Sequence, residues 1–486
     1  MQNITDIVQI KHEVLKATAE HAFNGNIYTD YDKIPYEIIQ GIKPQFRCCV
    51  YREREIIRQR VRMAMGKLPQ DVLYTDKDSS QIVHVIPCAC EGCPINKITV
   101  TQNCQGCLAK KCEKACPFNA IKTTSQGAVI DQEKCRKCGK CVAACPYQAI
   151  VEIERPCKKS CPVKAIDMDD NDIATINPEK CINCGACVVG CPFGAISDVS
   201  MMTNVIKAIN EGKEVVALIA PSIEGQFGED SLTQIKSAIK KVGFSDVYEV
   251  ALGADMVAVN EAEELLERKQ QDKKMTSSCC PAFVNLVQKH FPMLMPYVST
   301  MVSPMIAMER YVRLQRPDVV TVFIGPCIAK KNEVMSKYIG ELEYVLTYEE
   351  LFAMLSAKNI EVDKMEADEE EATRFGKGFA VSGGVTAAVE RVLEEKGGDV
   401  KVTAQKCSGI EECRKALLLL KVGKLPVDFI EGMACSGGCM GGPANLKELQ
   451  KSKKVFDTRL NGSKDIISNV KNHQAENTPI HRAFHE

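Results

Sequence analysis

The chain has 486 residues, of which 45% are hydrophobic and 26% are charged, a balance typical of globular proteins with roughly two to four domains. Its formal net charge of -1 argues against a general attraction to nucleic acid or to an acidic membrane surface. The first residues lack a signal-peptide pattern, and no apolar run approaches the roughly 18 residues that span a bilayer, so the sequence predicts a soluble cytoplasmic protein. In a reducing cytosol, 26 cysteines indicate metal binding rather than disulfides.

Residues 1–85 show apolar positions at helical spacing and many arginines, so we expect a small helical region there. Nineteen cysteines fall between Cys48 and Cys191 and seven in the remainder, which marks a boundary near residue 198. Within the cysteine-rich part, a C-P-x-x-A-I hexapeptide begins at positions 116, 145, 161 and 191. Such repeats indicate duplicated modules. We predict ferredoxin-like modules of α+β fold at 86–152 and 153–198, followed by a larger domain at 199–486.

The segment from Cys135 to Pro146 has the spacing C-x2-C-x2-C-x3-C-P of bacterial ferredoxins, in which three cysteines hold one 4Fe-4S cluster and the fourth serves its neighbour. Residues 181–192 repeat this spacing, and residues 104–117 differ only by two extra positions between the second and third cysteines. Zinc is the alternative, because C-x2-C pairs also bind it. Four C-P repeats at ferredoxin spacing favour iron-sulfur clusters.

Applied along the chain, the crossover rule predicts three complete clusters and one incomplete cluster. The predicted ligand sets are Cys104, Cys107, Cys112 and Cys145, then Cys135, Cys138, Cys141 and Cys116, then Cys181, Cys184, Cys187 and Cys161. Cys157 and Cys191 are then two ligands short of a fourth cluster. The nearest unassigned candidates are Cys88, Cys90 and Cys93. Cys48 and Cys49 fit buried thiols better than cluster ligands.

After residue 198, apolar runs typical of strands alternate with helical stretches, which is the pattern of an α/β domain. Three of these runs, at 215–222, 319–327 and 427–435, end in Pro, Ser or Cys. Open α/β sheets bind ligands at the carboxyl ends of their strands, so we expect the functional site where these runs end.

Three segments of this domain carry a family resemblance: SSCCPAF at 277–283, PCIAKKNE at 326–333 and MACSGGCMGG at 433–442. In this order they resemble the signature motifs of the iron-only (FeFe) hydrogenases, and the resemblance extends from about residue 85 to the end of the chain. It implies a two-lobed catalytic domain with an H-cluster between the lobes. That cofactor consists of a 4Fe-4S cluster and a two-iron subsite carrying carbonyl, cyanide and azadithiolate.

Carried over motif by motif, the resemblance implies that the cubane ligands are Cys280, Cys327, Cys435 and Cys439, with Cys439 bridging to the two-iron subsite. Buried cyanides need hydrogen-bond donors. The family donors match Lys330 and Ser222, the latter preceded by Pro221. Met433 and Phe379 match apolar residues that line the pocket.

The resemblance also implies a proton path that ends at Cys279, which matches the cysteine facing the azadithiolate. Glu261 and Glu264 lie three residues apart on one face of an expected helix, with Arg268 one turn beyond Glu264. Ser299 lies at the matching distance after the first motif. Taken alone, the acidic run fits a solvated helix face.

The resemblance therefore implies a hydrogenase that interconverts molecular hydrogen with protons and electrons, with a ferredoxin as electron partner and maturation enzymes for the two-iron subsite. A lysine-rich surface near the clusters, including Lys110 and Lys137, fits either an acidic redox partner or a solvated loop. Two alternatives remain: a sensory relative with low turnover, and a non-catalytic iron-sulfur protein of the same fold. Gly325 and Met305 depart from the usual family residues and bear on catalytic bias and oxygen tolerance.

Overall fold

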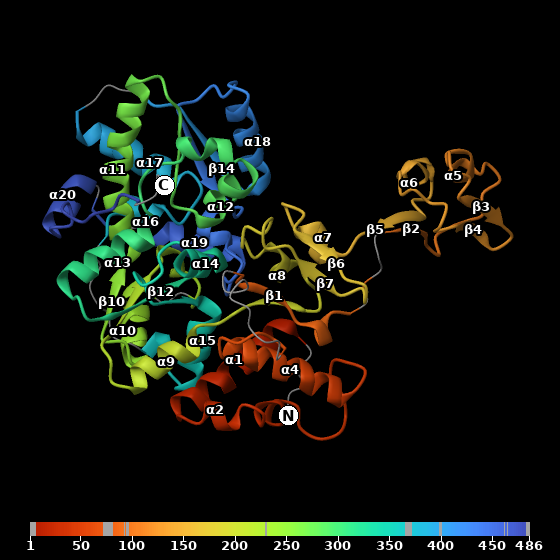
Figure 1. Cartoon of the computed structure of the whole chain (residues 1–486), viewed down its shortest axis with the longest axis horizontal. Helices are drawn as coiled ribbons and strands as arrows, with labels where there is room; N and C mark the ends of the chain where they lie inside the picture. The colour runs from red at the N-terminus through yellow and green to blue at the C-terminus, as the bar shows by residue number, and fades with distance from the viewer. Residues whose placement is uncertain are drawn as a thin grey trace.

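The computed structural model describes residues 6–70, 81–91, 93, 97–228, 231–364, 372–397, 401–460, 462–463 and 465–482. Residues 6–70 form helices at the amino-terminal end of the molecule (Figure 1). These helices are α1 (Ile7–Phe23), α2 (Ile27–Asp30), α3 (Ile34–Ile38) and α4 (Val50–Ala64). Helix α1 begins after Asp6, whose carboxylate accepts a hydrogen bond from the backbone N–H of Val8 at 2.8 Å.

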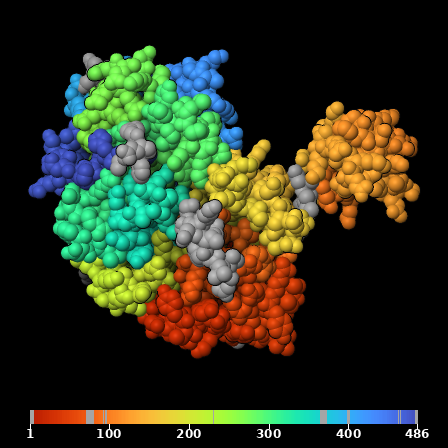
Figure 2. Space-filling view, in the orientation of Figure 1, coloured from red at the N-terminus to blue at the C-terminus, as the bar shows by residue number. Residues whose placement is uncertain are grey.

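Residues 97–153, which we call the outer module, fold around a small core of their own that includes Ile98, Ile121 and Ile150. The elements are β2 (Lys97–Val100), α5 (Lys111–Lys114), β3 (Ile121–Thr124), β4 (Gly127–Ile130), α6 (Lys140–Ala144) and β5 (Ile150–Ile153). Strand β2 pairs antiparallel with β5, and β3 pairs with β4. Figures 1 and 2 show this module standing apart from the remainder of the protein.

A second cysteine-rich unit lies against the larger domain and contains segments from both sides of the outer module (Figure 1). Its elements are β1 (Val83–Val85), η2 (Pro87–Ala89), α7 (Pro156–Ser160), β6 (Ile166–Met168), β7 (Ala174–Ile176), α8 (Ala186–Gly190) and β8 (Ile196–Asp198). Strands β1 and β8 pair antiparallel, with Val85 opposite Ile196, and β6 pairs with β7. We call residues 82–93 and 154–198 the inner module.

The larger domain contains two parallel sheets. The first has the order β10 (Asp246–Glu249), β9 (Val215–Ile219), β12 (Val320–Gly325), β13 (Tyr344–Thr347), and the second has the order β11 (Met275–Thr276), β15 (Phe429–Met433), β14 (Ala404–Ser408). Every residue of β9 and of β15 is buried. This explains the unbroken apolar sequence of β9, while β15 also buries Glu431.

Helices cover both sheets. They are α9 (Met202–Asn210), α10 (Leu232–Val242), α11 (Val250–Gln270), α12 (Pro281–His290), α13 (Pro304–Gln315), α14 (Ile328–Ser336), α15 (Tyr348–Ala357), α16 (Arg374–Gly378), α17 (Gly384–Glu395), α18 (Ile410–Lys421), α19 (Leu449–Arg459) and α20 (Ile466–Asn472). Short 3-10 turns are η3 (Pro221–Ile223), η4 (Pro292–Tyr297), η5 (Val362–Lys364) and η6 (Gly438–Gly441). In the described parts of the chain, no helix is both long and apolar enough to cross a membrane.

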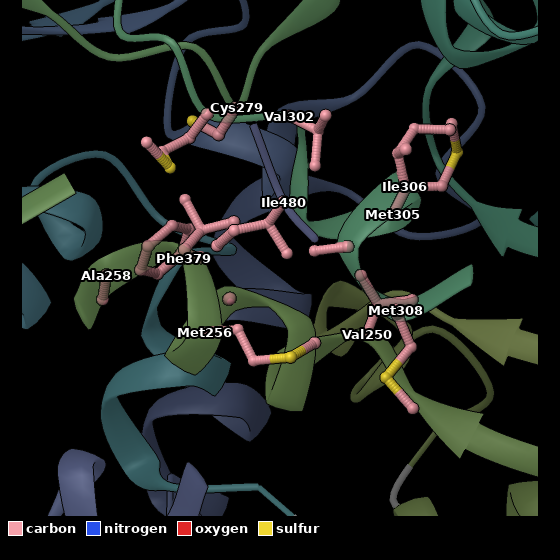
Figure 3. Close-up of a cluster of buried hydrophobic side chains, with 14 of the residues drawn as sticks. Val250, Met256, Ala258, Cys279, Val302, Met305, Ile306, Met308, Phe379 and Ile480 are labelled. Carbon is pink, nitrogen blue, oxygen red and sulfur yellow. The ribbon is translucent and has the colours of Figure 1, made fainter. Parts of the chain in front are cut away.

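The main core surrounds α11, which packs against α13, α16, α17 and α20. Figure 3 shows part of it, with Cys279 at one edge of the view and Phe379 between it and Met256. Cys279 therefore sits at the edge of a tightly packed apolar cluster, whose packing fixes the side chains around it.

Candidate active site

A cavity of about 90 Å³ lies where the carboxyl ends of β9, β12 and β15 meet the start of α12. Its lining includes Cys279, Cys280, Cys327, Cys435 and Cys439, the five cysteines singled out by the three sequence motifs. The same cavity is lined by the other predicted cofactor-binding residues, namely Lys330, Pro221, Ser222, Met433 and Phe379. The structure thus gathers residues separated by more than 200 positions in the sequence around one space.

Turns at the ends of strands and the starts of helices hold these cysteines in place. Cys280 and Cys327 are the N-cap residues of α12 and α14, both with extended backbone. Cys439 lies in η6, after Gly437 at φ +81° and Gly438 at φ +76°. A Cβ on Gly438 would lie 2.8 Å from the backbone oxygen of Ala380, so this turn requires glycine.

Two polar side chains line the cavity, and each has a hydrogen-bond partner within the protein. Lys330 is buried, and its ammonium donates a hydrogen bond to Glu333 Oε2 at 2.7 Å, one helical turn away. The Ser222 hydroxyl lies 2.7 Å from the hydroxyl of Tyr348, which is also buried. Tyr348 was not predicted from the sequence, because nothing in its surroundings there distinguishes it from an ordinary core tyrosine.

Two family departures lie at this cavity. Gly325 ends β12, and a Cβ on it would lie 2.6 Å from the ring of Phe323, which itself lines the cavity. Phe323 therefore occupies the space that a side chain at position 325 would need. Met305 also lines the cavity and is fully buried, so the cavity lining is apolar and shielded from solvent at this position.

The predicted proton-path residues form a buried series that leads away from Cys279. Glu261 is 0% exposed, and its Oε1 accepts a weak hydrogen bond from the backbone N–H of Ser278 at 3.3 Å. Its Oε2 has no hydrogen-bond partner among the described residues. Burial and the neighbouring carboxylate of Glu264 raise the pKa of Glu261 to about 8. Burial, and next the carboxylate of Glu261, also raise the pKa of the Cys279 thiol well above its usual range.

Glu264 lies nearer to solvent and is held by several donors. Arg268 donates to its Oε1 from Nη2 at 2.6 Å and from Nε at 2.9 Å, and the Ser299 hydroxyl donates to its Oε2 at 2.8 Å. The backbone N–H of Thr300 adds a bond at 3.0 Å. These contacts join Glu264, Arg268 and Ser299 into one hydrogen-bonded group, and Ser299 also lowers the pKa of the buried Glu261.

The carboxyl-terminal segment contributes a residue that the sequence did not indicate. Arg482 donates from Nη2 to the backbone oxygen of Ser278 at 3.0 Å and from Nε to that of Met301 at 2.8 Å. Its charge also lowers the pKa of Glu261, against the stronger effect of burial. No local motif could have revealed this contact, because Arg482 is 204 positions from Ser278.

The predicted accessory ligand sets are also grouped in space. Cys104, Cys107, Cys112 and Cys145 line one small cavity of the outer module. The electrostatic neighbours of the Cys141 thiol include Cys135 and Cys116, and those of Cys187 are Cys184, Cys181 and Cys161. Both patterns follow the crossover rule. The exposed Cys138 lies in the loop between Cys135 and helix α6, which contains Cys141.

The repeated hexapeptide has a structural role in both modules. In each repeat, the backbone N–H of the alanine donates to the sulfur of the cysteine four residues earlier, at 3.2 to 3.3 Å. The pairs are Ala120 with Cys116, Ala149 with Cys145, Ala165 with Cys161 and Ala195 with Cys191. Such bonds stabilise a thiolate and tune the potential of a cluster bound to it.

The inner module touches the active-site cavity directly. Cys184 lines the cavity, and it is an electrostatic neighbour of Cys435. The adjacent Gly185 packs so closely that a Cβ would lie 2.7 Å from Pro443 and 2.8 Å from Ile328. A cluster bound by Cys184 would therefore stand next to the cubane site of the larger domain.

The donor chemistry fits the cofactors that the motifs imply. Four cysteines around one cavity suit a cubane, and the cavity offers one ammonium, one hydroxyl and an otherwise apolar lining to a polar group bound beside it. Among the described residues, no three His, Cys, Asp or Glu side chains are gathered closely enough to be recognised as a site for a single metal ion.

Comparisons with known proteins agree with this arrangement. Residues 213–443 match the family "Iron only hydrogenase large subunit, C-terminal domain", residues 151–202 match an LdpA Fe-S cluster-binding domain, and residues 128–150 match a 4Fe-4S binding domain. These matches confirm the predicted fold class, an α/β domain preceded by ferredoxin-like 4Fe-4S modules.

Among similar proteins, iron hydrogenase 1 of Clostridium pasteurianum is 30% identical over 421 residues, which cover 74% of this chain and 72% of that protein. The periplasmic Fe hydrogenase large subunit of Nitratidesulfovibrio vulgaris is 30% identical over 54% of this chain and 76% of its own length. Cytosolic iron-sulfur assembly component 3 of Rattus norvegicus is 24% identical over 50% of this chain and 64% of its own length.

A solved FeFe-hydrogenase, HydA(deltaEFG), is 19% identical, with 56% of this chain and 94% of that chain covered and a TM-score of 0.46. The sequence match to the clostridial protein spans most of both chains, and the family match at residues 213–443 covers the region whose strand ends carry the five cysteines. On these grounds the chain belongs to the iron-only hydrogenase family.

Proposed function

We propose that this protein is a catalytically active FeFe hydrogenase that interconverts molecular hydrogen with protons and electrons. The observation that carries the proposal is the buried series of acid groups that ends beside the cysteine-lined cavity. Glu261 holds a proton at neutral pH because its pKa is raised to about 8, and it is an electrostatic neighbour of the Cys279 thiol. A protein that only transfers electrons or assembles clusters has no need for such a path.

Cys280, Cys327, Cys435 and Cys439 would hold the cubane of the H-cluster, with Cys439 also bound to the two-iron subsite. When bound, the H-cluster supplies the electrons and the iron at which hydrogen is formed or split. Lys330, whose position is fixed by Glu333, would donate a charge-assisted hydrogen bond to a cyanide ligand.

The proton path divides into an outer and an inner part. Arg268 and Glu264 are partly exposed, at 15% and 11% of their side chains, so protons exchange with solvent there. The Ser299 hydroxyl links Glu264 to the buried Glu261, since it donates to the former and lowers the pKa of the latter. The Cys279 thiol stays protonated, because burial opposes its ionisation, and so it can pass a proton to the cavity.

Electrons would reach the cavity through the clusters of the two modules, the last of them bound by Cys184 at the cavity wall. The outer module exposes lysines around its cysteines, including Lys110, Lys111 and Lys137, and also Leu108 at 97% exposure. A basic surface with an exposed apolar residue suits an acidic carrier such as a ferredoxin, which we propose as the electron partner.

The proposal is tested by producing the protein without oxygen together with the maturation enzymes of the two-iron subsite. We expect infrared bands of carbonyl and cyanide, together with hydrogen evolution from a reduced ferredoxin. Bands without turnover would indicate a sensory relative, and no bands would indicate an iron-sulfur protein without the two-iron subsite. Either result would contradict the proposal.

The Cys279→Ala variant tests the proton path within the same preparation. Because Cys279 is not a predicted iron ligand, the infrared bands should remain while hydrogen evolution falls by at least about 100-fold, the lower end of the range for a lost acid-base group. Cys48→Ala is the matched control: the prediction of a buried thiol at this position was wrong, because Cys48 is exposed, and it is not part of the cavity lining. Near-normal turnover of the Cys279→Ala variant would refute the assignment of the path.

A further inference from the structure

We propose that Cys90, Cys93, Cys157 and Cys191 bind an additional 4Fe-4S cluster. In this arrangement the inner module binds two clusters, and the outer module is inserted into it between Cys93 and Cys157. The sequence alone provided only Cys157 and Cys191 for this cluster and did not decide which two of Cys88, Cys90 and Cys93 complete it. The inference does not depend on whether the protein turns over hydrogen.

The backbone brings the two distant segments together. Strand β1 pairs with β8, with Val85 opposite Ile196, and the pairing continues with a hydrogen bond from the N–H of Ile86 to the backbone oxygen of Ala195 at 2.7 Å. The chain then turns through η2, and the N–H of Cys90 donates to the backbone oxygen of Ile86 at 3.1 Å. Cys90 therefore lies next to Cys191, whose sulfur accepts a hydrogen bond from the backbone N–H of Ala195.

The four thiols are mutual neighbours. The strongest side-chain electrostatic neighbours of Cys157 are Cys191, Cys90 and Cys93, and those of Cys93 include Cys191 and Cys90. Cys90, Cys157 and Cys191 also pack on the same apolar cluster, which includes Val83 and Ile196. Each of the other three sites takes three cysteines from one segment and the fourth from a C-P repeat. Here Cys90 and Cys93 keep the C-x2-C spacing and Cys191 is the C-P cysteine, while the third ligand, Cys157, comes from beyond the inserted outer module.

Cys88 is the candidate that the arrangement leaves out. Its strongest side-chain electrostatic neighbours are Glu55, Arg52 and Arg60, all on α4, and no cysteine is among them. It packs on the apolar cluster that includes Ile56 and Met63, which Cys90 and Cys191 also contact, but unlike them it does not pack on the cluster that contains Cys157. Cys88 therefore faces the amino-terminal helices, whereas Cys90 and Cys93 face Cys157.

Buried positive charge provides an independent reason to place an anionic group here. Arg60 is 5% exposed, is an electrostatic neighbour of Cys191, and has no carboxylate ion pair in the described part of the chain. Arg155 is 3% exposed, has Asp172 Oδ1 at 3.8 Å as its carboxylate partner, and is an electrostatic neighbour of Cys93. The Nε atoms of both arginines are buried without a hydrogen-bond partner among the described residues. Burying a cation with an incomplete set of partners is costly, and a cubane bound by four thiolates carries net negative charge that would offset this cost.

The insertion is compatible with the geometry of the outer module. Lys97 and Ile153, close to its two ends, are cross-strand partners of β2 and β5, so the chain leaves and re-enters the inner module at neighbouring points. Residues 93 and 157 lie just beyond these strands. The proposed cluster would then stand beside the one bound by Cys161 and Cys184, because α7 and α8 pack together, and it would lie on the route from the outer module to the cavity.

The double variant Cys90→Ala/Cys93→Ala tests the assignment in the full chain, with Cys88→Ala as the matched control. Iron and acid-labile sulfide are measured in protein produced without the maturation enzymes, which should carry four accessory clusters and one active-site cubane. We expect the double variant to lose about one fifth of both, with the loss of one reduced-cluster signal in electron paramagnetic resonance, while the control keeps its full content. Unchanged iron in the double variant, an equal loss in the control, or zinc bound by these cysteines would overturn the proposal.

A measurement on the unmodified protein keeps the test independent of any folding defect in the variants. Thiols are alkylated without oxygen before and after removal of iron by a chelator, and the modified sites are identified by mass spectrometry. We expect Cys93 to be modified only after iron removal, since a bound cluster protects it, and Cys48 to be modified in both samples because it is exposed. Modification of Cys93 while all clusters are intact would overturn the assignment.

Discussion

Replacement of Glu261 by glutamine should stabilise the protein at alkaline pH and stop its proton transfer. The pKa of Glu261 is raised to about 8 from an ordinary 4.5. At about 1.36 kcal/mol for each pH unit, this difference corresponds to up to about 5 kcal/mol of stability. Because the folded-state pKa is the higher one, that stability is fully present below pH 4.5 and is lost as the pH rises through 8. The neutral amide of Glu261→Gln escapes this loss.

The assay compares thermal unfolding of the wild type and the variant at pH 6 and pH 9 under identical conditions without oxygen. At pH 6 the wild-type glutamate is neutral in the folded state but ionised in the unfolded state, so about 2 kcal/mol of this stability is already lost. We therefore expect a small rise in the midpoint of the variant at pH 6 and a larger rise, of several degrees, at pH 9. Hydrogen evolution of the variant should fall by at least about 100-fold at either pH, because the amide cannot exchange a proton.

The matched control is Glu263→Gln on the same helix. Glu263 is exposed and pairs with Lys396 at the surface. Its replacement should change the stability by no more than about 0.5 kcal/mol, as for other surface ion pairs, and should leave the turnover unchanged. The reasoning would be refuted if Glu261→Gln unfolded at the same or a lower temperature than the wild type at pH 9. Near-normal hydrogen evolution by that variant would refute the route through Glu261.

Three further changes test other parts of the structure. Ser299→Ala removes the 2.8 Å bond to Glu264, so hydrogen evolution should fall by at least about 10-fold while the infrared bands stay unchanged; equal turnover would place the path elsewhere. Lys331→Met leaves the buried carboxylate of Glu350 and the partly buried one of Asp198, 2.9 and 2.7 Å from the lysine in the wild type, without their cation. Chemical denaturation should show a loss of about 3 to 5 kcal/mol, and a loss under about 1 kcal/mol would contradict the reasoning. Replacing residues 97–153 by a short Gly-Ser linker should remove about two fifths of the iron, because two of the five cubanes are lost. Electron transfer from ferredoxin should become slower, while turnover with a small artificial reductant persists. Loss of the clusters of the inner module as well would contradict the proposed insertion.

The cavity was predictable because its residues lie at positions with local signals. Cys280 and Cys327 each follow an apolar run and precede a helix, and parallel strands bring their carboxyl ends to one edge. The fold class followed from the same alternation of runs, together with the ferredoxin spacing. The positions of the predicted path residues followed from helical geometry, since Glu261, Glu264 and Arg268 lie within two turns of α11.

Contacts between distant segments could not be predicted from one sequence. Arg482 reaches Ser278 only because the carboxyl-terminal segment bridges to Met301, and no motif surrounds it. The choice among the three cysteines at 88–93 depends on the register of β1 against β8, and a short strand of three residues carries almost no register signal in its sequence. The boundary expected at residue 86 likewise separates β1 from the segment that follows it, although both lie in the inner module.

The adjacent cysteines at 279 and 280 show why the site needs its exact spacing. Cys280 is the extended N-cap of α12 and packs between two apolar clusters, one around α11 and one around α12 and α18, whereas Cys279 packs with Phe379 and Met433 near Glu261. In extended backbone, successive side chains point in opposite directions, so one peptide unit would separate the proposed iron ligand from the proposed proton donor. A slip of one residue would exchange the two proposed roles. Proline at 281 fixes the first turn of the helix, and we infer that it thereby holds the electron path and the proton path in register.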